Sequence, residues 1–159
     1  MHRDYAWSLQ GRRAHVHSDK RNGTQVSLLA ALSLEGFLAS LLVEGSVDAA
    51  VFAYYLHNYL CPVLREGQIV VLDNCKIHLG DSIPAMIEAK GAKLCFLPAY
   101  SPDLSPLENA FSKLKTILKS LGASCLDSLS LAVHQAMNSI SLADIIGWFR
   151  LCGYSAHSF

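Results

Sequence analysis

The stretch LPAYSPDLSPLEN, residues Leu97–Asn109, separates a part of the chain rich in predicted strands from a helical part. Its three prolines argue against a helix or a central strand before Pro106, because proline lacks the backbone N–H and restricts the residue before it. Beyond Pro106, apolar residues recur at three- and four-residue spacing, which predicts an amphipathic helix with proline in its first turn. The apolar positions are Leu107, Ala110, Phe111, Leu114, Leu118 and Leu121.

Upstream of this stretch, short apolar runs alternate with a segment that favours a helix. Lys93–Leu97 is a candidate strand, and so is the apolar run Gln68–Leu72. A short continuous apolar run of this kind is typical of a strand buried on both faces, in the interior of a sheet. Between the two runs, Asp81 or Ser82 can begin a helix that extends to about Ala89.

The region before these strands predicts a hairpin followed by a helix. Segments 25–32 and 37–43 are rich in Leu, Val and Ala, and Glu35-Gly36 between them suggests an antiparallel turn. Ser46 can cap a helix over residues 47–60.

Two further helices are expected near residues 127–139 and 142–151. The predicted order is therefore hairpin, helix, strand, helix, strand and helices. This order indicates an α/β domain whose mixed sheet has parallel strands at its later end and helices over its faces. At 159 residues, the whole chain, 1–159, fits a single domain.

Composition narrows the class of protein. The chain is 52% hydrophobic and 16% charged, as expected of a globular protein. No apolar run reaches the roughly 18 residues of a membrane span, and the N-terminus does not resemble a secretory signal, so we expect a cytoplasmic protein without a membrane partner. The five cysteines form no CxxC pair and are expected to be reduced thiols.

Charge gives only a weak indication of nucleic-acid binding. The net charge is zero, which argues against tight DNA binding by this segment alone. Residues 1–21 nevertheless carry five basic residues against two acidic ones. Charge alone favours a solvated surface for this modestly basic end.

Two carboxylates are placed where chemistry could occur. Asp73 follows the run 68–72, and Glu108 begins the helix that follows the next strand. Sites in open sheets form beyond the carboxyl ends of the strands, where two carboxylates can share a divalent cation. Such a cation can activate water or a 3′-hydroxyl against a phosphodiester. Glycoside hydrolysis also uses paired carboxylates, although nothing else in the sequence suggests a sugar site.

Each of these acids also has a structural explanation. Asp73-Asn74 can be a turn after a strand, because Asp and Asn side chains bond to the nearby backbone. Ser105 and Glu108, with Pro106 between them, match a capping box at a helix N-terminus. Local patterns alone favour these structural interpretations over catalysis.

Nearby polar residues are equally ambiguous. His78 fits a loop histidine better than a metal ligand, because no second histidine lies at ligand spacing. Lys113 and Lys115 can contact phosphate, or they can belong to an ordinary solvated helix face.

Longer strings of residues resemble a known family. Leu97–Asn109, followed by Phe111–Lys115, resembles the signature around the third acidic residue of mariner-like bacterial insertion-sequence transposases. Val71–His78 resembles the second acidic motif of that family, an Asp-Asn pair after a strand with a histidine shortly after it. Between Asp73 and Glu108 lie 34 residues, the spacing for which this group of families is known.

The resemblance implies an RNase H-like fold, a mixed sheet flanked by helices, with an acidic-triad (DDE) endonuclease site. It implies DNA strand cleavage and strand transfer with Mg²⁺ or Mn²⁺, with Asp73 and Glu108 as catalytic metal ligands. The implied partner is DNA, both transposon ends and target, and the family also admits a transposase dimer. The candidate nucleic-acid-binding residues are Arg12, Arg13, Lys113 and Lys115.

The chain departs from the family pattern at its start. Family members carry their first catalytic Asp on the first strand, before a stretch that resembles Arg3–Ser8 and Gly11–Arg13. Here Met1 falls between the position of that first Asp and the stretch that begins at Arg3, and Asp4 does not align with the missing acid. We therefore expect a truncated domain that lacks its first strand, is marginally stable, binds Mg²⁺ weakly or not at all and does not cleave DNA alone.

Three hypotheses follow from this departure. The chain is an inactive transposase remnant, or a functional half that an upstream polypeptide or frameshifted translation completes. In a third hypothesis it is a non-catalytic interaction module that pairs with full-length transposase and inhibits it.

Overall fold

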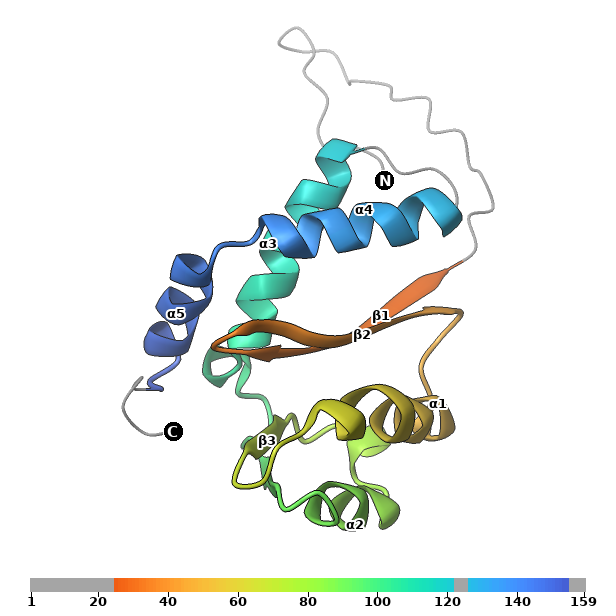
Figure 1. Ribbon diagram of the computed structural model, residues 1–159, viewed down its shortest axis with the longest axis vertical. Coiled ribbons are helices and arrows are strands. Elements are labelled where there is room, and N and C mark those ends of the chain that lie inside the picture. Colours follow the sequence, from red (N-terminus) through yellow and green to blue (C-terminus); the bar gives the residue numbers. More distant parts are fainter. Residues whose placement is uncertain (1–24, 122–125, 155–159) are drawn as a thin grey trace, which may run out of the picture.

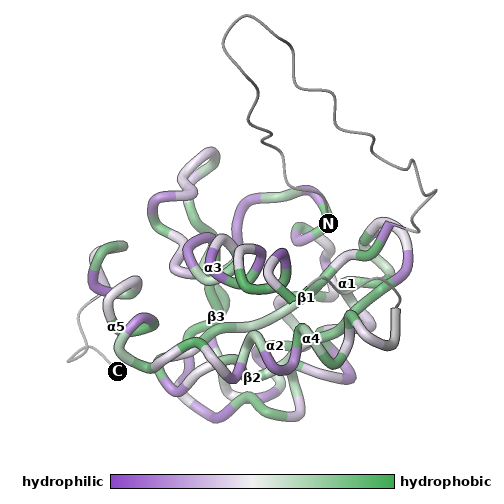
Figure 2. Tube along the Cα trace, turned by 90° about the horizontal axis from the view of Figure 1, so that it is seen from above, coloured by the Kyte–Doolittle hydropathy of each residue, from purple (hydrophilic) through white to green (hydrophobic). Residues whose placement is uncertain are grey.

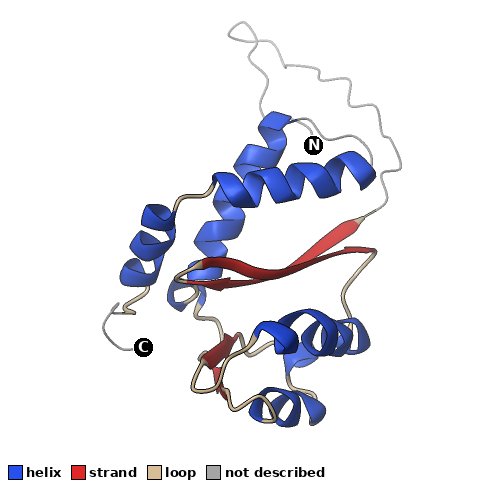
Figure 3. Ribbon diagram, viewed as in Figure 1, coloured by secondary structure: helices blue, strands red, loops and turns tan. Residues whose placement is uncertain are grey.

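The structure is a computed structural model that describes residues 25–121 and 126–154, with the backbone alone at residues 126 and 127. It contains short strands and helices of moderate length (Figure 3). In chain order the strands and α-helices are β1 (Val26–Ser33), β2 (Gly36–Glu44), α1 (Ala49–Tyr55), β3 (Ile69–Leu72), α2 (Ser82–Glu88), β4 (Lys93–Phe96), α3 (Pro106–Leu121), α4 (Leu126–Ser139) and α5 (Leu142–Leu151).

The first two strands form the predicted antiparallel hairpin. Leu28 lies opposite Leu42, and Leu29 lies opposite Leu41. The turn uses Gly36 at a φ of 123°, a backbone conformation that residues other than glycine rarely adopt. Because side chains alternate along a strand, the two leucine pairs face opposite sides of the hairpin.

The helix after the hairpin begins two residues later than predicted. The Asp48 carboxylate accepts a hydrogen bond of 2.8 Å from the backbone N–H of Val51, so Asp48 and not Ser46 caps α1. Ser46 lies five residues before Val51, outside the spacing of two or three residues at which a cap side chain reaches a backbone N–H. Helical structure continues beyond α1 as a π-helical turn to Leu60, where the sequence predicted the helix to end.

Strands β3 and β4 form a separate parallel pair, with Val71 opposite Cys95. Val70 and Leu72 pack on the core, but the alternate residues Ile69 and Val71 are 48% and 39% exposed. The prediction that this strand is buried on both faces is therefore wrong, because no described element covers the second face. Among the described residues, β3 pairs only with β4, so the strands form two small sheets and not one continuous sheet.

The hairpin is the middle layer of the molecule (Figure 1). Its face with Leu29 and Leu41 packs on a core that α1, α2 and the inner side of the β3–β4 pair complete. Its opposite face, with Leu28 and Leu42, packs on a second core made by α3, α4 and α5. Figure 2 shows hydrophobic residues along β1 and β3, the strands that contribute to these cores.

The C-terminal helices agree with the sequence prediction. Helix α3 begins at Pro106, and α4 and α5 lie within one residue of the predicted ranges. Helix α5 has a complete capping box, in which Ser141 and Asp144 satisfy each other's backbone N–H groups. Within residues 25–121 and 126–154, no helix combines the length and the apolarity that crossing a membrane requires.

Candidate metal centre

Asp73 occupies the carboxyl end of β3. The backbone N–H of Leu97 donates a 2.8 Å hydrogen bond to the carbonyl oxygen of Leu72, which joins the ends of the two parallel strands directly before Asp73. The Asp73 side chain is 64% exposed. Its carboxylate is therefore presented to solvent at a position that the sheet fixes.

The Asp73 carboxylate bonds to a side chain and not to its own turn. Its Oδ1 contacts Nδ1 of His78, whose side chain is only 15% exposed. The same Nδ1 lies 3.3 Å from the carbonyl oxygen of Asp73. The structure records no bond from the carboxylate to a backbone N–H among the described residues, so the turn interpretation does not account for the Asp73 side chain.

Glu108 lies in the first turn of α3, and its side chain is exposed. Its backbone N–H donates to the carbonyl oxygen of Ser105 at 3.2 Å. Within the described parts of the chain, neither the Ser105 hydroxyl nor the Glu108 carboxylate makes a capping hydrogen bond. The predicted capping box at this helix is therefore wrong, because a backbone bond closes the first turn instead, and the carboxylate oxygens remain available.

The proline-rich loop before Glu108 is held at two points. Its start follows β4, and Tyr154 donates a 2.9 Å hydrogen bond from its hydroxyl to the carbonyl oxygen of Leu104. Burial raises the pKa of Tyr154, so its hydroxyl keeps its proton and donates over the neutral range. The sequence does not predict this tether, since no local pattern links residues 50 positions apart.

Asp73 and Glu108 follow neighbouring strands of the parallel pair along the chain. Asp73 directly follows β3, and the loop to Glu108 directly follows the neighbouring β4. Two exposed carboxylates supply hard oxygen donors of the kind that Mg²⁺ and Mn²⁺ bind. Between residues 25 and 154, however, the described side chains form no group of three or more potential metal ligands. The structure therefore shows two separate exposed oxygen donors and no assembled metal site among the described residues.

The basic residues of the predicted DNA surface have different environments. Lys113 Nζ lies 2.6 Å from Asp144 Oδ2 and joins α3 to α5, so it serves at least a structural role. Lys115 is exposed on the same helix, as a solvated helix face requires. Arg12 and Arg13 lie outside the described residues.

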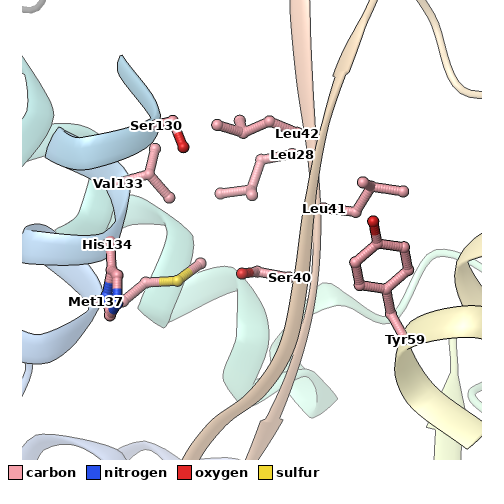
Figure 4. Close-up of a pocket in the computed structure, with 9 residues that line it drawn as sticks. All are labelled: Leu28, Ser40, Leu41, Leu42, Tyr59, Ser130, Val133, His134 and Met137. Carbon is pink, nitrogen blue, oxygen red and sulfur yellow. The ribbon is translucent and has the colours of Figure 1, made fainter. Parts of the chain in front are cut away.

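One open cavity of about 380 Å³ lies away from the two acids, between the hairpin and α4. Figure 4 shows Leu28 and Leu42 directed toward Val133 and Met137, with Leu41 and Tyr59 on the other side of the hairpin. No carboxylate lines the cavity. It therefore offers no alternative location for the predicted metal chemistry.

Comparison with known families and structures decides the classification. The model of the family described as DDE superfamily endonuclease matches residues 1–130. The chain belongs to this family. In the DDE family the endonuclease depends on a divalent metal. No curated protein sequence matches this DDE-family chain.

Solved structures confirm the RNase H-like fold. The chain is similar to Mos1 transposase in a pre-cleavage transpososome, with a TM-score of 0.73 and 18% identity over 95% of this chain and 47% of that one. The Mos1 strand transfer complex gives a TM-score of 0.71, 19% identity and coverage of 95% and 46%. The catalytic domain of Mos1 mariner transposase matches with a TM-score of 0.66 and 20% identity over 79% of this chain and 66% of that one. The DDE-family chain spans about half the length of the Mos1 chains in these two complexes.

Proposed function

We propose that this DDE-family chain is the catalytic domain of a DNA transposase, in which Asp73 and Glu108 hold the divalent cation that assists cleavage and transfer of DNA strands. The observation that carries the proposal is that Asp73 directly follows β3, that the loop to Glu108 begins where the neighbouring β4 ends, and that both side chains are exposed. A cation bound there would activate a water or 3′-hydroxyl and stabilise the leaving oxygen. The Mos1 structures of similar fold contain transposon ends, which supports DNA as the partner.

We further propose that the chain alone does not cleave DNA. Among the described residues, no group of three or more acidic, histidine or cysteine side chains is placed to hold a cation. Two carboxylates leave most of the coordination sphere of a magnesium ion to water. A third carboxylate from another polypeptide would complete the site, and the uncovered face of β3 at Ile69 and Val71 offers an apolar surface for such a polypeptide.

The uncovered strand also supports an inhibitory role as a second candidate. A chain with an exposed apolar strand can associate with an intact transposase without contributing to catalysis. Co-purification of the two proteins would support this role. Failure to associate at micromolar concentrations would remove it.

A nicking assay tests the proposed catalytic function. The substrate is a supercoiled plasmid that carries the gene with its natural flanking DNA, in Mg²⁺ or Mn²⁺. We expect no nicking by the chain alone and nicking when it is co-expressed with a polypeptide encoded directly upstream. Asp73→Asn and Glu108→Gln should each remove this activity. Asp103→Asn, in the exposed loop before α3, is the matched control and should retain it.

The outcomes separate the proposals. Nicking by the chain alone that Asp73→Asn abolishes would contradict the proposed inactivity and support the metal site. Nicking that survives both Asp73→Asn and Glu108→Gln would contradict the metal site itself. An upstream sequence that does not encode an apolar strand followed by Asp would exclude the hypothesis of a functional half. The hypotheses of an inactive remnant and of an inhibitor would then remain.

A further inference from the structure

His78 lies between a buried aromatic ring and the exposed Asp73 carboxylate. Its side chain is 15% exposed, whereas that of Asp73 is 64% exposed. The two side chains contact each other through Nδ1 of the imidazole and Oδ1 of the carboxylate. A mostly buried donor therefore bonds to a mostly exposed acceptor, and the buried partner determines where the pair sits.

The His78 ring is fixed by its packing and its backbone. The ring centroid lies 4.2 Å from that of Phe52 at an interplanar angle of 39°. Phe52 is 3% exposed and belongs to the core that α1 and α2 share with the hairpin. The backbone N–H of His78 donates a 2.9 Å hydrogen bond to the carbonyl oxygen of Cys75, which closes the short helical turn Lys76–His78. The imidazole therefore loses little further conformational entropy when it bonds to Asp73.

This contact leaves one side of the Asp73 carboxylate open. Nδ1 contacts Oδ1 and also lies 3.3 Å from the backbone carbonyl oxygen of Asp73. In the part of the chain that the structure describes, Oδ2 has no hydrogen-bond partner. A carboxylate with one oxygen held and the other free is prepared to bind a cation through the free oxygen. Carboxylates that ligate metals are commonly oriented by such a second hydrogen bond.

We propose that His78 is a positioning residue for Asp73. Supported by Phe52, it donates a hydrogen bond from Nδ1 to Oδ1 and holds Oδ2 toward the carboxyl end of the β3–β4 pair. The proposal rests on the proposed function, in which Asp73 is a metal ligand. His78 itself does not touch the cation.

The test is a Mn²⁺ titration of the purified chain, followed by paramagnetic broadening of the backbone amide signals of Asp73 and Asn74. This measurement detects weak binding and needs no DNA cleavage. His78→Phe keeps an aromatic ring against Phe52 but removes the donor, and His78→Asn keeps an N–H donor near the position of Nδ1. His134→Phe, at an exposed position of α4, controls for the loss of a histidine as such.

We expect His78→Phe to raise the apparent Mn²⁺ dissociation constant by about tenfold or more, the usual effect of removing an outer-shell partner. His78→Asn should lie closer to the parent chain, and His134→Phe should match it. A merely structural role would weaken binding in both His78 variants in proportion to their loss of thermal stability. Should His78→Phe not fold, His78→Leu, of similar bulk and without a donor, carries the same expectation.

Two kinds of failure are distinguishable. If His78→Phe binds Mn²⁺ like the parent chain while Asp73→Asn does not bind it, the positioning role is overturned and the metal site stands. If the parent chain shows no broadening at Asp73, or Asp73→Asn leaves the broadening unchanged, the proposed metal role of Asp73 fails, and the role of His78 fails with it.

Discussion

At the scale of single residues, the two candidate metal ligands are held in different ways. Asp73 is oriented by the side chain of His78, which in turn packs on Phe52. Glu108 is placed by the start of α3 alone, and its carboxylate has no hydrogen bond within the described residues. We therefore expect Asp73 to be ordered before a cation binds and Glu108 to become ordered on binding.

The two lysines of α3 allow a prediction about DNA binding. Lys115 is exposed, whereas Lys113 is engaged by Asp144. If Lys115 contacts a DNA phosphate, Lys115→Gln should reduce the slope of log affinity against log salt by about 1, because one counterion fewer is released. Fluorescence anisotropy with labelled duplex DNA at several salt concentrations measures this slope. An unchanged slope would assign Lys115 to the solvated face of the helix.

The sequence predicted which strand and helix carry the two acids but not which side chains the acids contact. Position followed from two apolar runs and one amphipathic helix, which are local patterns. The His78–Phe52 packing joins residues 26 positions apart, and the Tyr154 tether joins residues farther apart still. Such contacts depend on how elements pack, which a local pattern does not show. The capping box considered at Glu108 and the turn considered at Asp73 were inferred from adjacent residues, and neither bond forms among the residues that the structure describes.

At the scale of elements, an ion pair joins α3 to α5. Asp144 accepts from Lys113 of α3 and also bonds to Ser141 at the start of its own helix. The Lys113 hydrogen bond, followed by that of Ser141, holds the pKa of the Asp144 carboxyl below its ordinary value of 3.8. One side chain thus caps α5 and links it to α3.

Removing the cap should measurably destabilise the chain. Ser141→Ala deletes the hydroxyl that accepts from the backbone N–H of Asp144. We expect the free energy of unfolding to fall by about 1 kcal/mol, as is usual for a lost N-cap. Urea denaturation followed by circular dichroism measures the change, and Ser130→Ala, at an exposed position of α4, is the control. Equal stability of the two variants would mean that the capping box contributes nothing.

The ion pair predicts a specific loss of stability in acid. Because the folded-state pKa of Asp144 is lowered, its contribution is present above the ordinary pKa of 3.8 and is lost as the pH falls through the lower, folded-state value. The melting temperature should therefore fall more steeply below about pH 4 in the parent chain than in Lys113→Met. Melting curves between pH 3 and pH 6 test this. Parallel pH profiles would contradict it.

The sequence was less informative about β3 than about the helices. Its run of apolar residues predicted a strand buried on both faces, but Ile69 and Val71 are substantially exposed. Apolar content shows what a strand is suited to contact, and the actual burial depends on which other elements cover it. The hairpin and the amphipathic α3 were predicted more accurately, since their periodicity and turn residues are local.

At the scale of the whole molecule, the hairpin separates and connects two cores. Leu29 and Leu41 belong to the core with α1 and α2, and Leu28 and Leu42 belong to the core with α3 and α4. Each core therefore uses one face of the same two strands. We expect the two cores to unfold together, because loss of either one removes half of the burial that stabilises the hairpin.

A core substitution tests this coupling. Leu56 is fully buried in the first core, and Leu56→Ala should cost about 2 to 5 kcal/mol. Trp148 packs on the second core, and its fluorescence in a Trp7→Phe background reports on that core. The urea midpoint seen by Trp148 should shift as far as the midpoint seen by circular dichroism. The exposed Leu131→Ala is the control, and a Trp148 midpoint that does not move would show that the cores unfold separately.

We propose that Asp73 and Glu108 form one divalent metal site on an RNase H-like fold. The most direct measurement is an anomalous difference map from crystals of the chain soaked in Mn²⁺. We predict a peak at the carboxyl end of the β3–β4 pair, bonded to oxygens of both carboxylates. A map without a peak there, or with Mn²⁺ bound only elsewhere, would contradict the claim.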